Sequence, residues 1–272
     1  MNNAGEYYNS HSIGYVDKWD LSERGLKKPA NHYRLEIIST MVAMAGLKKG
    51  DRVVEIGCGT GLVLREMSKV TTPLYATDIS LSMLERVKDS LLNDKKVSIV
   101  DNFTQTLSDQ SVEVFLMQND LLSLNLPKNY FDKIMSMEVL RYVDDFPKAL
   151  ENVKEIMKPE SLFVFTITNL FSLSFFPIKY SLRKMLGLVN QEKELLQYFV
   201  TEREIKRYLK EAGLKIVSFK KLNLLTFNPL VERLVDTDSK AMKVVELDSF
   251  LSKVPIVNKF FDTFVLAVKV DG

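Results

Sequence analysis

Apolar residues recur along this chain in two alternating patterns. Short runs rich in β-branched residues are typical of strands, and longer stretches that repeat their apolar positions every three or four residues are typical of helices. The predicted strands are residues 52–56, 74–77, 111–117, 130–136, 161–168, 214–221 and 263–269. The predicted helices are residues 33–45, 62–69, 80–92, 145–157 and a last one between Thr201 and Gly213. Strands that alternate with helices predict an α/β fold with a doubly wound, mainly parallel sheet of seven strands.

Two apolar stretches interrupt this alternation. Residues 170–200 are long for a connection, and residues 222–259 are longer than a hairpin needs. We therefore predict a lid insertion at 170–200 and a cap insertion at about 222–259. The remaining chain divides into an amino-terminal helical segment (1–45), a core (46–169) and a part that completes the sheet (201–272). Within that part, Thr201 and Glu204 have the spacing of a capping box at a helix start.

Composition and charge narrow the class of protein. The chain has 272 residues, of which 46% are hydrophobic and 26% charged, as in ordinary globular proteins. Its 37 basic and 35 acidic residues give a net charge of +2 without a basic cluster, which argues against a nucleic-acid substrate. The first ten residues do not resemble a signal peptide, and no apolar run is long enough to span a bilayer, so a cytoplasmic location is predicted. One cysteine and two histidines give no metal-binding framework, and no metal is expected.

A glycine-rich turn follows the strand at residues 52–56. Gly57, Gly59 and Gly61 stand at alternate positions between this strand and a helix, so the backbone can approach a ligand closely. The dinucleotide fingerprint needs its third glycine one position later, where this chain has Leu62. Glu55, beside the turn, would repel a pyrophosphate and favour a ligand that carries an ammonium and a sulfonium.

Asp78 ends the next predicted strand about 20 residues further on, where a carboxylate can accept ribose hydroxyls. Together with the segments 78–84, 118–120 and 131–136, this spacing makes residues 30–220 resemble class I S-adenosylmethionine-dependent methyltransferases. The resemblance implies a Rossmann-like methyltransferase fold and S-adenosylmethionine as cofactor. It assigns the glycines to the methionine part, Glu55 to the ammonium and Asp78 to the ribose. The further cofactor contacts that it implies are Ile79, Met83, Asn119, Asp120, Leu121 and Ser136.

Several of these acids have simpler structural interpretations. Asp120 stands where the family places the acid that accepts from the adenine amino group, but it could equally cap a helix before Leu121. Asp78 could cap the helix that begins near Ser80, and Glu55 could be a solvated charge at a strand end.

The residues that would act on the methyl acceptor are fewer. Methyl transfer from a sulfonium requires alignment and exclusion of water, and a hydroxyl or ammonium acceptor also requires a base. Glu138 follows the fourth strand of the core, on the expected methyl side, and Tyr142 and His11 are the other catalytic candidates. Further polar residues considered for this role are Asp144, His32, Tyr7 and Tyr8. The family often folds its amino-terminal segment, here residues 1–45, over the cofactor.

The segments 136–143 and 163–169 are similar to those of quinone-biosynthesis O-methyltransferases. Those enzymes carry a second acid and a histidine where this chain has Arg141 and Tyr142, so their metal site is not carried over. The expected activity is methyl transfer to an O or N atom of a small or amphiphilic molecule. The exocyclic-amine methyltransferases of nucleic acids would need an Asn/Asp-Pro-Pro-aromatic loop where residues 136–139 stand. The alternative from another class is a noncatalytic, regulatory protein that binds S-adenosylmethionine.

The predicted lid has an unusually apolar composition. Residues 171–188 combine aromatic and aliphatic side chains with Lys179, Arg183 and Lys184, a pattern that suits an interfacial helix. Three interpretations stay open: a lid that packs over the pocket, the interface of a homodimer, and peripheral contact with a membrane.

Overall fold

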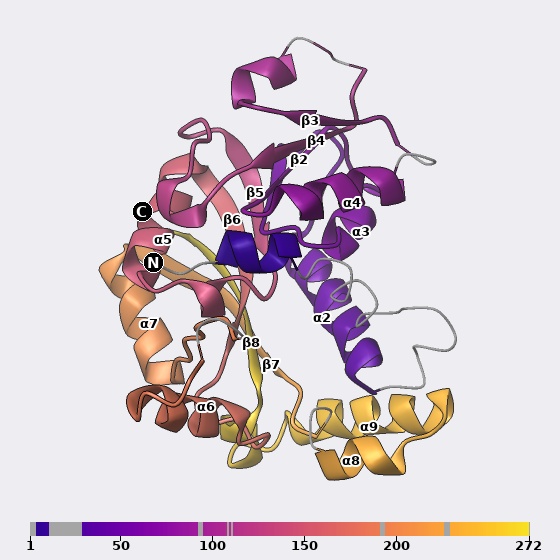
Figure 1. Ribbon diagram of the computed structural model, residues 1–272, viewed down its shortest axis with the longest axis vertical. Coiled ribbons are helices and arrows are strands. Elements are labelled where there is room, and N and C mark those ends of the chain that lie inside the picture. Colours follow the sequence, from indigo (N-terminus) through magenta and orange to yellow (C-terminus); the bar gives the residue numbers. More distant parts are fainter. Residues whose placement is uncertain are drawn as a thin grey trace.

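The computed structural model describes residues 4–10, 29–91, 95–107, 109, 111–190, 194–225 and 229–271 (Figure 1). One twisted sheet runs through the molecule, with a hydrophobic cluster on each of its faces. Phe146 and Ile205 belong to the cluster on one face, whereas Met41 and Leu64 belong to the cluster on the other. Helices therefore cover both faces of the sheet, as a doubly wound fold requires.

The sheet contains eight strands among the described residues, in the order β3-β4-β2-β1-β5-β6-β8-β7. The strands are β1 (Val53–Ile56), β2 (Leu74–Asp78), β3 (Val97–Val100), β4 (Val114–Gln118), β5 (Phe131–Ser136), β6 (Met157–Thr168), β7 (Leu214–Leu222) and β8 (Thr263–Val270). Pairing is parallel from β3 to β6 and antiparallel where β8 lies between β6 and β7. The predicted mainly parallel, doubly wound sheet is confirmed.

The predicted number of seven strands is wrong, because β3 was missed. This strand pairs in parallel with β4 at the edge of the sheet. Of its four residues only Val97 is buried, while Ser98, Ile99 and Val100 are partly exposed. A strand this short carries neither a continuous apolar run nor a clear alternation, so the sequence pattern did not mark it.

The central strands are apolar because the sheet is covered on both faces. All four residues of β1 and all five residues of β2 are buried, which is typical of parallel strands. Strand β1 lies between β2 and β5, so the strand order reverses at β1. In open α/β sheets the crevice at the carboxyl ends of the strands beside such a reversal is the usual ligand site.

The helices of the core begin and end close to the predicted positions. They are α2 (Pro29–Ala45), α3 (Leu62–Met67), α4 (Leu81–Leu91), α5 (Phe146–Ile156) and α7 (Glu202–Glu211). The predicted capping box is confirmed at α7, where Thr201 Oγ1 accepts from Glu204 N at 3.2 Å and Glu204 Oε2 accepts from Thr201 N at 2.8 Å. Asp145 caps α5 rather than belonging to it. None of the described helices is long and apolar enough to cross a bilayer.

Strand β6 begins earlier than predicted. It starts at Met157, directly after α5, and passes through Pro159 rather than beginning at Ser161. Met157 pairs with Phe131, and the register shifts before Leu162 pairs with Lys133. Proline is tolerated beside such an irregularity because the ladder is already interrupted there.

The residues predicted as lid and cap contain additional helices at one end of the molecule (Figure 1). The lid segment carries α6 (Phe176–Met185), and the cap segment carries α8 (Pro229–Leu234), α9 (Asp238–Leu251) and the 3₁₀ helix η5 (Val257–Phe260). Helix α9 packs against α2, where His32 Nε2 lies 2.5 Å from Asp238 Oδ1.

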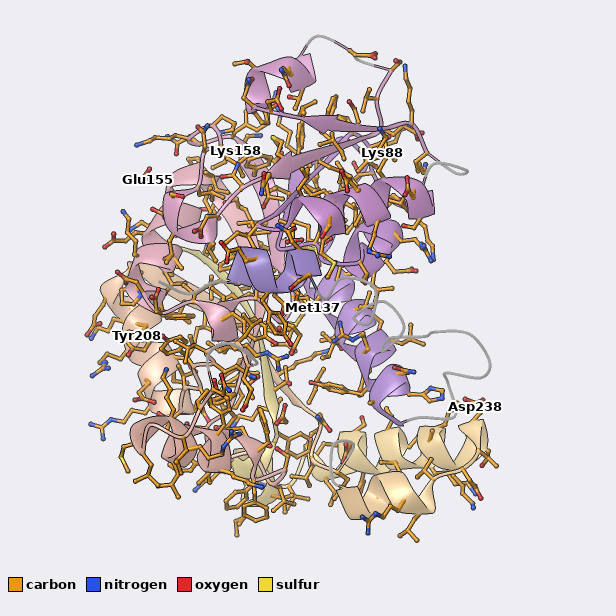
Figure 2. The ribbon with its side chains drawn as sticks, viewed as in Figure 1. Lys88, Met137, Glu155, Lys158, Tyr208 and Asp238 are labelled. Carbon is orange, nitrogen blue, oxygen red and sulfur yellow. The ribbon has the colours of Figure 1, made fainter. Side chains whose placement is uncertain are left out.

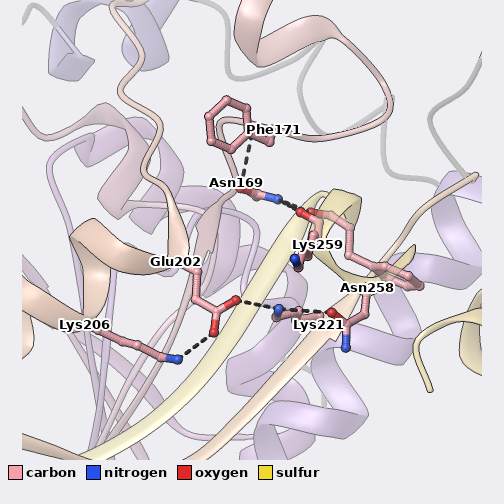
Figure 3. A network of polar contacts seen from close by, with 8 residues as sticks. Asn169, Phe171, Glu202, Lys206, Lys221, Asn258 and Lys259 are labelled. Carbon is pink, nitrogen blue, oxygen red and sulfur yellow. Dashed lines mark hydrogen bonds and ion pairs between the residues drawn. The ribbon is translucent and has the colours of Figure 1, made fainter. Parts of the chain in front are cut away.

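A polar network joins the lid segment to the end of the cap segment (Figure 3). Buried Asn169, at the end of β6, donates from Nδ2 to the carbonyl oxygens of Lys259 at 2.9 Å and Phe261 at 2.8 Å. Its Oδ1 accepts from Phe171 N at 3.2 Å. Nearby, Lys221 of β7 contacts Glu202 of α7 at 2.6 Å. The two insertions, far apart in sequence, are therefore anchored side by side.

Candidate active site

A cavity of about 400 Å³ opens where the carboxyl ends of β1, β2, β4 and β5 meet. Its volume lies within the range of small-molecule sites, about 300–1,000 Å³. Most of the predicted site residues line it, namely Glu55, Gly57, Gly59, Asp78, Ile79, Met83, Asn119, Asp120, Leu121, Glu138 and Tyr142. Met137, which Figure 2 labels, also lines the cavity. The strand order thus gathers residues that are dispersed along the sequence.

The glycine turn is fixed to β2 and exposes its backbone to the cavity. Thr77 O accepts from Gly57 N at 2.7 Å and from Cys58 N at 2.9 Å. Gly57 has φ 71° and Gly59 has φ 51°, in the left-handed region that glycine adopts readily. A Cβ on Gly57 would lie 2.2 Å from Val139 Cγ2, whereas one on Gly59 would meet no atom within 4 Å. The turn therefore packs against the segment after β5 on one side and leaves room for a ligand on the other.

Glu55 is the most deeply buried acid of the cavity. Glu55 is 1% exposed, and its Oε2 has no hydrogen-bond partner in the described part of the chain. Burial, and to a lesser degree the nearby Asp78 carboxylate, raises the pKa of Glu55 well above its usual value. An unsatisfied buried oxygen costs about 1–3 kcal/mol, and a cationic ligand group would remove that cost. This arrangement fits the ammonium of an amino-acid ligand.

Asp78 holds the glycine turn in addition to facing the cavity. Its Oδ2 accepts from Gly59 N at 2.8 Å and its Oδ1 accepts from Ser80 N at 2.9 Å. Burial raises the pKa of Asp78, and the Ser80 and Gly59 amides oppose that shift. Each carboxylate oxygen has a second lone pair. The carboxylate can therefore still accept hydroxyl protons from a ligand while it braces the turn.

One part of the cavity lining combines apolar side chains with polar groups. Ile79, Met83 and Leu121 supply the apolar side chains. Asp120 Oδ1 accepts from Leu122 N at 2.9 Å and caps the 3₁₀ helix η3 (Leu121–Ser123). The simpler role considered for Asp120, capping a helix, therefore applies to one of its two carboxylate oxygens. Asn119 Oδ1 accepts from Asn125 N at 2.8 Å. An aromatic heterocycle with hydrogen-bonding edges fits this combination.

The opposite wall is formed by the segment after β5. Glu138 has φ 61°, an unusual value for a residue with a side chain, and its backbone N donates to Thr166 Oγ1 at 2.7 Å. Its Oε2 lies 2.8 Å from Arg141 Nη1. Arg141 also donates from Nη2 to Tyr142 Oη at 2.7 Å. Arg141 therefore bridges Glu138 and Tyr142, two of the three predicted catalytic residues, a role that the sequence did not indicate.

Further acidic and phenolic groups lie behind Glu138. Asp262, which precedes β8, is buried. Burial raises its pKa, the hydrogen bond from the Ser172 hydroxyl opposes this rise, and the charge of Glu138 adds to it. Burial and then the charges of Glu138 and Asp262 also raise the pKa of Tyr33 well above 10.0. Glu138 thus belongs to a polar layer that reaches from the cavity to the base of the two insertions.

The helix of residues 4–10 lies against the cofactor wall. Asn9 Oδ1 accepts from Ser80 Oγ at 2.7 Å and from Ser82 Oγ at 3.1 Å. Ala4 and Tyr8 line the cavity, and the Tyr8 ring meets the Tyr142 ring edge to face, with centroids 6.1 Å apart. Both walls of the cavity are therefore in contact with this helix.

Of the described residues that were predicted or considered, Gly61, Ser136, His32 and Tyr7 do not line the cavity. Gly61, with φ 75°, precedes α3, and Ser136 Oγ donates to Ile56 O at 3.0 Å, which links β5 to β1. His32 contacts Asp238 at the far end of α2 (Figure 2). His11 lies outside the described residues.

Arg34 and Val139 line the cavity but were missed as site residues. Arg34 precedes Ile37 and Ile38 by three and four positions, so it lies on the buried face of α2. A cation on the apolar face of a helix was the sequence signal that could have marked Arg34 as a site residue. Nothing in the sequence marked Val139, because its role depends on how closely Gly57 approaches it.

A glycine turn between a buried strand and a helix, with acids at the ends of neighbouring strands of a mainly parallel sheet, is typical of a Rossmann-like methyltransferase. The chain belongs to the methyltransferase domain family Methyltransf_23, whose model matches residues 30–219. It is an S-adenosylmethionine-dependent methyltransferase, and the resemblance predicted from the sequence is confirmed.

Two relatives and one solved structure illustrate the similarity. The ubiquinone/menaquinone biosynthesis C-methyltransferase UbiE of Stutzerimonas stutzeri is 26% identical over 79% of this chain and 82% of the relative. The ubiquinone biosynthesis O-methyltransferase of Alkalilimnicola ehrlichii is 26% identical over 82% of this chain and 83% of the relative. Magnesium protoporphyrin IX methyltransferase from Synechocystis, solved with bound SAH, shares the fold with a TM-score of 0.57 at 15% identity, over 97% of both chains.

Proposed function

We propose that the protein transfers the methyl group of S-adenosylmethionine to an oxygen or nitrogen atom of a small or amphiphilic molecule. The observation that carries this proposal is Glu138. Its carboxylate stands in the wall of the same cavity as the glycine turn, on a backbone with φ 61°. Strained backbone of this kind persists only where the surroundings hold it, and it clusters at active sites.

The cofactor would lie along the wall formed by β1, β2 and β4. We assign its ammonium to Glu55, whose buried Oε2 otherwise has no partner in the described residues. The ribose hydroxyls fall to Asp78, and the adenine to the apolar wall around Ile79, with Asp120 at its amino group. The space beside Gly59 leaves room for the methionine part. No contact from Gly61 or Ser136 is part of this assignment.

S-adenosylmethionine supplies a methyl group that is already activated by the sulfonium. The residues of this chain then have to align the acceptor and accept its proton. We assign proton acceptance to Glu138 Oε1, because Oε2 is paired with Arg141. The lone pair left on the acceptor forms the new bond to the methyl carbon, and the C–S pair returns to sulfur. We also assign to Tyr142, which lines the cavity and whose Oη accepts from Arg141, a hydrogen bond to the acceptor.

Exclusion of water falls to the amino-terminal helix. Tyr8 contacts Tyr142 across the cavity, so residues 4–10 cover the reaction site where the two walls approach each other. A closed, dry site strengthens the electrostatic effect of Glu138 on the acceptor. His11 remains a candidate base on sequence grounds alone.

The lining of the cavity and the names of the relatives support an amphiphilic acceptor. Met137, Val139 and Val143 give the acceptor side apolar surface beside the polar Glu138–Arg141–Tyr142 group. Such a surface suits a molecule with one polar, methylated end and an apolar body. Two relatives are named for steps of ubiquinone or menaquinone biosynthesis, which is consistent with an amphiphilic acceptor.

The decisive experiment is transfer of a ¹³C-labelled methyl group from S-adenosylmethionine into a metabolite and lipid extract. The labelled product is isolated, its mass is measured, and the chemical shift of the methyl carbon distinguishes O-, N- and C-methylation. We expect an O- or N-methylated product. A labelled methyl group bonded to carbon would refute the proposed acceptor atom, and absence of any labelled product would refute the proposed substrate class.

The chain offers a matched pair of carboxylates for the control. Glu138→Gln and Asp144→Asn each remove one negative charge from the cavity wall, but only Glu138 lies on the strained backbone and in the bridge with Arg141. We expect Glu138→Gln to suppress transfer by about 10²-fold or more while Asp144→Asn retains most of it.

A further inference from the structure

Most of the exposed large apolar side chains of the described chain lie on two segments. The first, residues 171–188, includes Phe175 at 62% and Met185 at 76% exposure. The second, residues 249–261 at the end of the cap, includes Phe250 at 64% and Ile256 at 74% exposure. Isolated exposed apolar residues need no explanation, but a concentration of them marks an interaction surface.

The two segments form one surface, called here the lid–cap surface. Leu173 N donates to Phe260 O at 2.9 Å, and Asn169 ties both segments together through Lys259 and Phe261 (Figure 3). Helices α6 and α9 lie at the same end of the molecule, at the opposite end from β3 (Figure 1). Apolar residues separated by about 70 positions in the sequence are thereby presented together.

Phe175 adds a conformational observation. It precedes α6 with φ 57°, a left-handed value that is costly for an aromatic residue, and its ring is nonetheless exposed. Phe175 N donates to Ser172 O and Phe175 O accepts from Lys179 N, both at 3.0 Å, so this backbone is held by hydrogen bonds within the chain and fixes the ring in an exposed position. Strained residues that their surroundings hold in place cluster at sites where ligands bind.

The charge of the surface identifies the kind of partner. Residues 171–188 and 249–261 contain Lys179, Arg183, Lys184, Lys253 and Lys259, and no acidic residue. Arg183 is paired with Glu194 at 2.7 Å, and Lys184 lies over the Tyr198 ring, but the other three lysines are exposed. Aromatic and aliphatic side chains beside exposed cations match the acyl boundary and headgroups of an anionic bilayer.

We propose that the lid–cap surface docks the enzyme on an anionic lipid bilayer. A second copy of this chain is a poorer partner, because a twofold interface would set these cations against their own images. The proposal extends the expectation for residues 171–188 to the carboxyl-terminal cap, so that both segments are required. It is independent of the proposed methyl acceptor, because vesicle binding is measured without turnover.

The test is flotation of the purified protein with vesicles of equimolar phosphatidylcholine and phosphatidylglycerol, compared with phosphatidylcholine alone. The lid variant is Phe175→Asn with Met185→Gln, and the cap variant is Phe250→Gln with Ile256→Gln. We expect each variant to bind the anionic vesicles more than about tenfold more weakly than the wild type. Salt at about 1 M, where the Debye length is about 3 Å, should also weaken wild-type binding.

The control is Val217→Gln. Val217 is 54% exposed and lies at the irregularity in the β7–β8 pairing, outside the lid–cap surface. Circular dichroism and melting temperatures verify that every variant is folded. Absence of wild-type binding, or equal loss by Val217→Gln, would overturn the proposal. Loss in only one of the two variants would refute a joint surface. A wild-type dimer that both variants abolish would assign the surface to a second copy instead.

Discussion

Replacement of Asp78 by alanine tests the ribose assignment and the turn geometry at once. The carboxylate accepts from Gly59 N at 2.8 Å and Ser80 N at 2.9 Å, so the variant loses two charge-assisted bonds inside the protein. Each unsatisfied donor costs about 1–3 kcal/mol, less where water enters the cavity. At roughly 2–4 °C per kcal/mol, we expect the melting temperature to fall by about 5 °C or more, although the protein still folds.

The cofactor should lose affinity for a separate reason. Each hydrogen bond from a ribose hydroxyl to the carboxylate contributes about 1.5–3 kcal/mol, so affinity for S-adenosylhomocysteine should fall at least about tenfold to a hundredfold. Calorimetric titration measures this change. A thermodynamic cycle that combines Asp78→Ala with the 2′-deoxy analogue of S-adenosylhomocysteine separates the loss of the ribose contact from the loss of the turn. An analogue without the 2′-hydroxyl should be less sensitive to Asp78→Ala.

Asp78→Asn is the matched control. It retains one carbonyl oxygen as an acceptor but loses the charge, so its melting temperature and affinity should lie between those of wild type and Asp78→Ala. If a folded Asp78→Ala binds S-adenosylhomocysteine as tightly as wild type, the ribose assignment is wrong. If the natural ligand and its 2′-deoxy analogue lose affinity equally, Asp78 acts only by holding the turn.

Three further predictions concern other parts of the molecule. Glu138→Gln should leave the dissociation constant for S-adenosylhomocysteine within about twofold of wild type, measured by calorimetry, because Glu138 faces the acceptor; a large loss of affinity would contradict that role. Burial, and next the charge of Asp248, raises the pKa of Glu36 from 4.5 to about 7. The folded state therefore binds the proton on the Glu36 carboxyl more tightly than the unfolded state. The contribution of this proton to the stability of the fold is complete below pH 4.5 and is lost as the pH rises through about 7. Melts from pH 4 to 8 should show Glu36→Gln gaining stability over wild type across that window, and parallel pH profiles would refute it. Asn9→Ala removes the acceptor for the Ser80 hydroxyl and should accelerate release of S-adenosylhomocysteine about fivefold in stopped-flow measurements, whereas an unchanged rate would mean that residues 4–10 do not cover the cofactor.

The parts of the fold that the sequence predicted are those with strong local signals. Strand β1 reads as a buried apolar run that ends in glycines, and α7 carries a complete capping box. The sequence did not predict β3, because a strand of four residues that is only partly buried leaves no periodic signal. The start of β6 was predicted too late, because proline, here Pro159, normally interrupts a strand ladder. The pairing of Met157 with Phe131 overrides that preference.

The candidate site was predictable where a motif fixes the position of each residue along a strand. Glu55 and Asp78 lie at the carboxyl ends of apolar strands, so their place at one sheet edge could be inferred. The bridge from Arg141 to Glu138 and Tyr142 could not, because it depends on the backbone turn at Glu138. Asp262 joins the same region only because β8 returns between β6 and β7, a long-range pairing that local patterns do not contain.

The position of β8 has a consequence for synthesis of the chain on the ribosome. Among the described strands β7 pairs only with β8, and β8 in turn separates β7 from β6. When residues 214–222 leave the ribosome, their partner at 263–270 has not yet been translated. Strand β7 therefore stays unpaired until the cap segment and β8 have followed. A nascent chain can assemble β1 to β6 during that interval, since domains fold as translation proceeds at about 5–20 residues per second. The last eight-residue strand then completes the sheet from within, and premature termination before Thr263 would release β7 together with the cap.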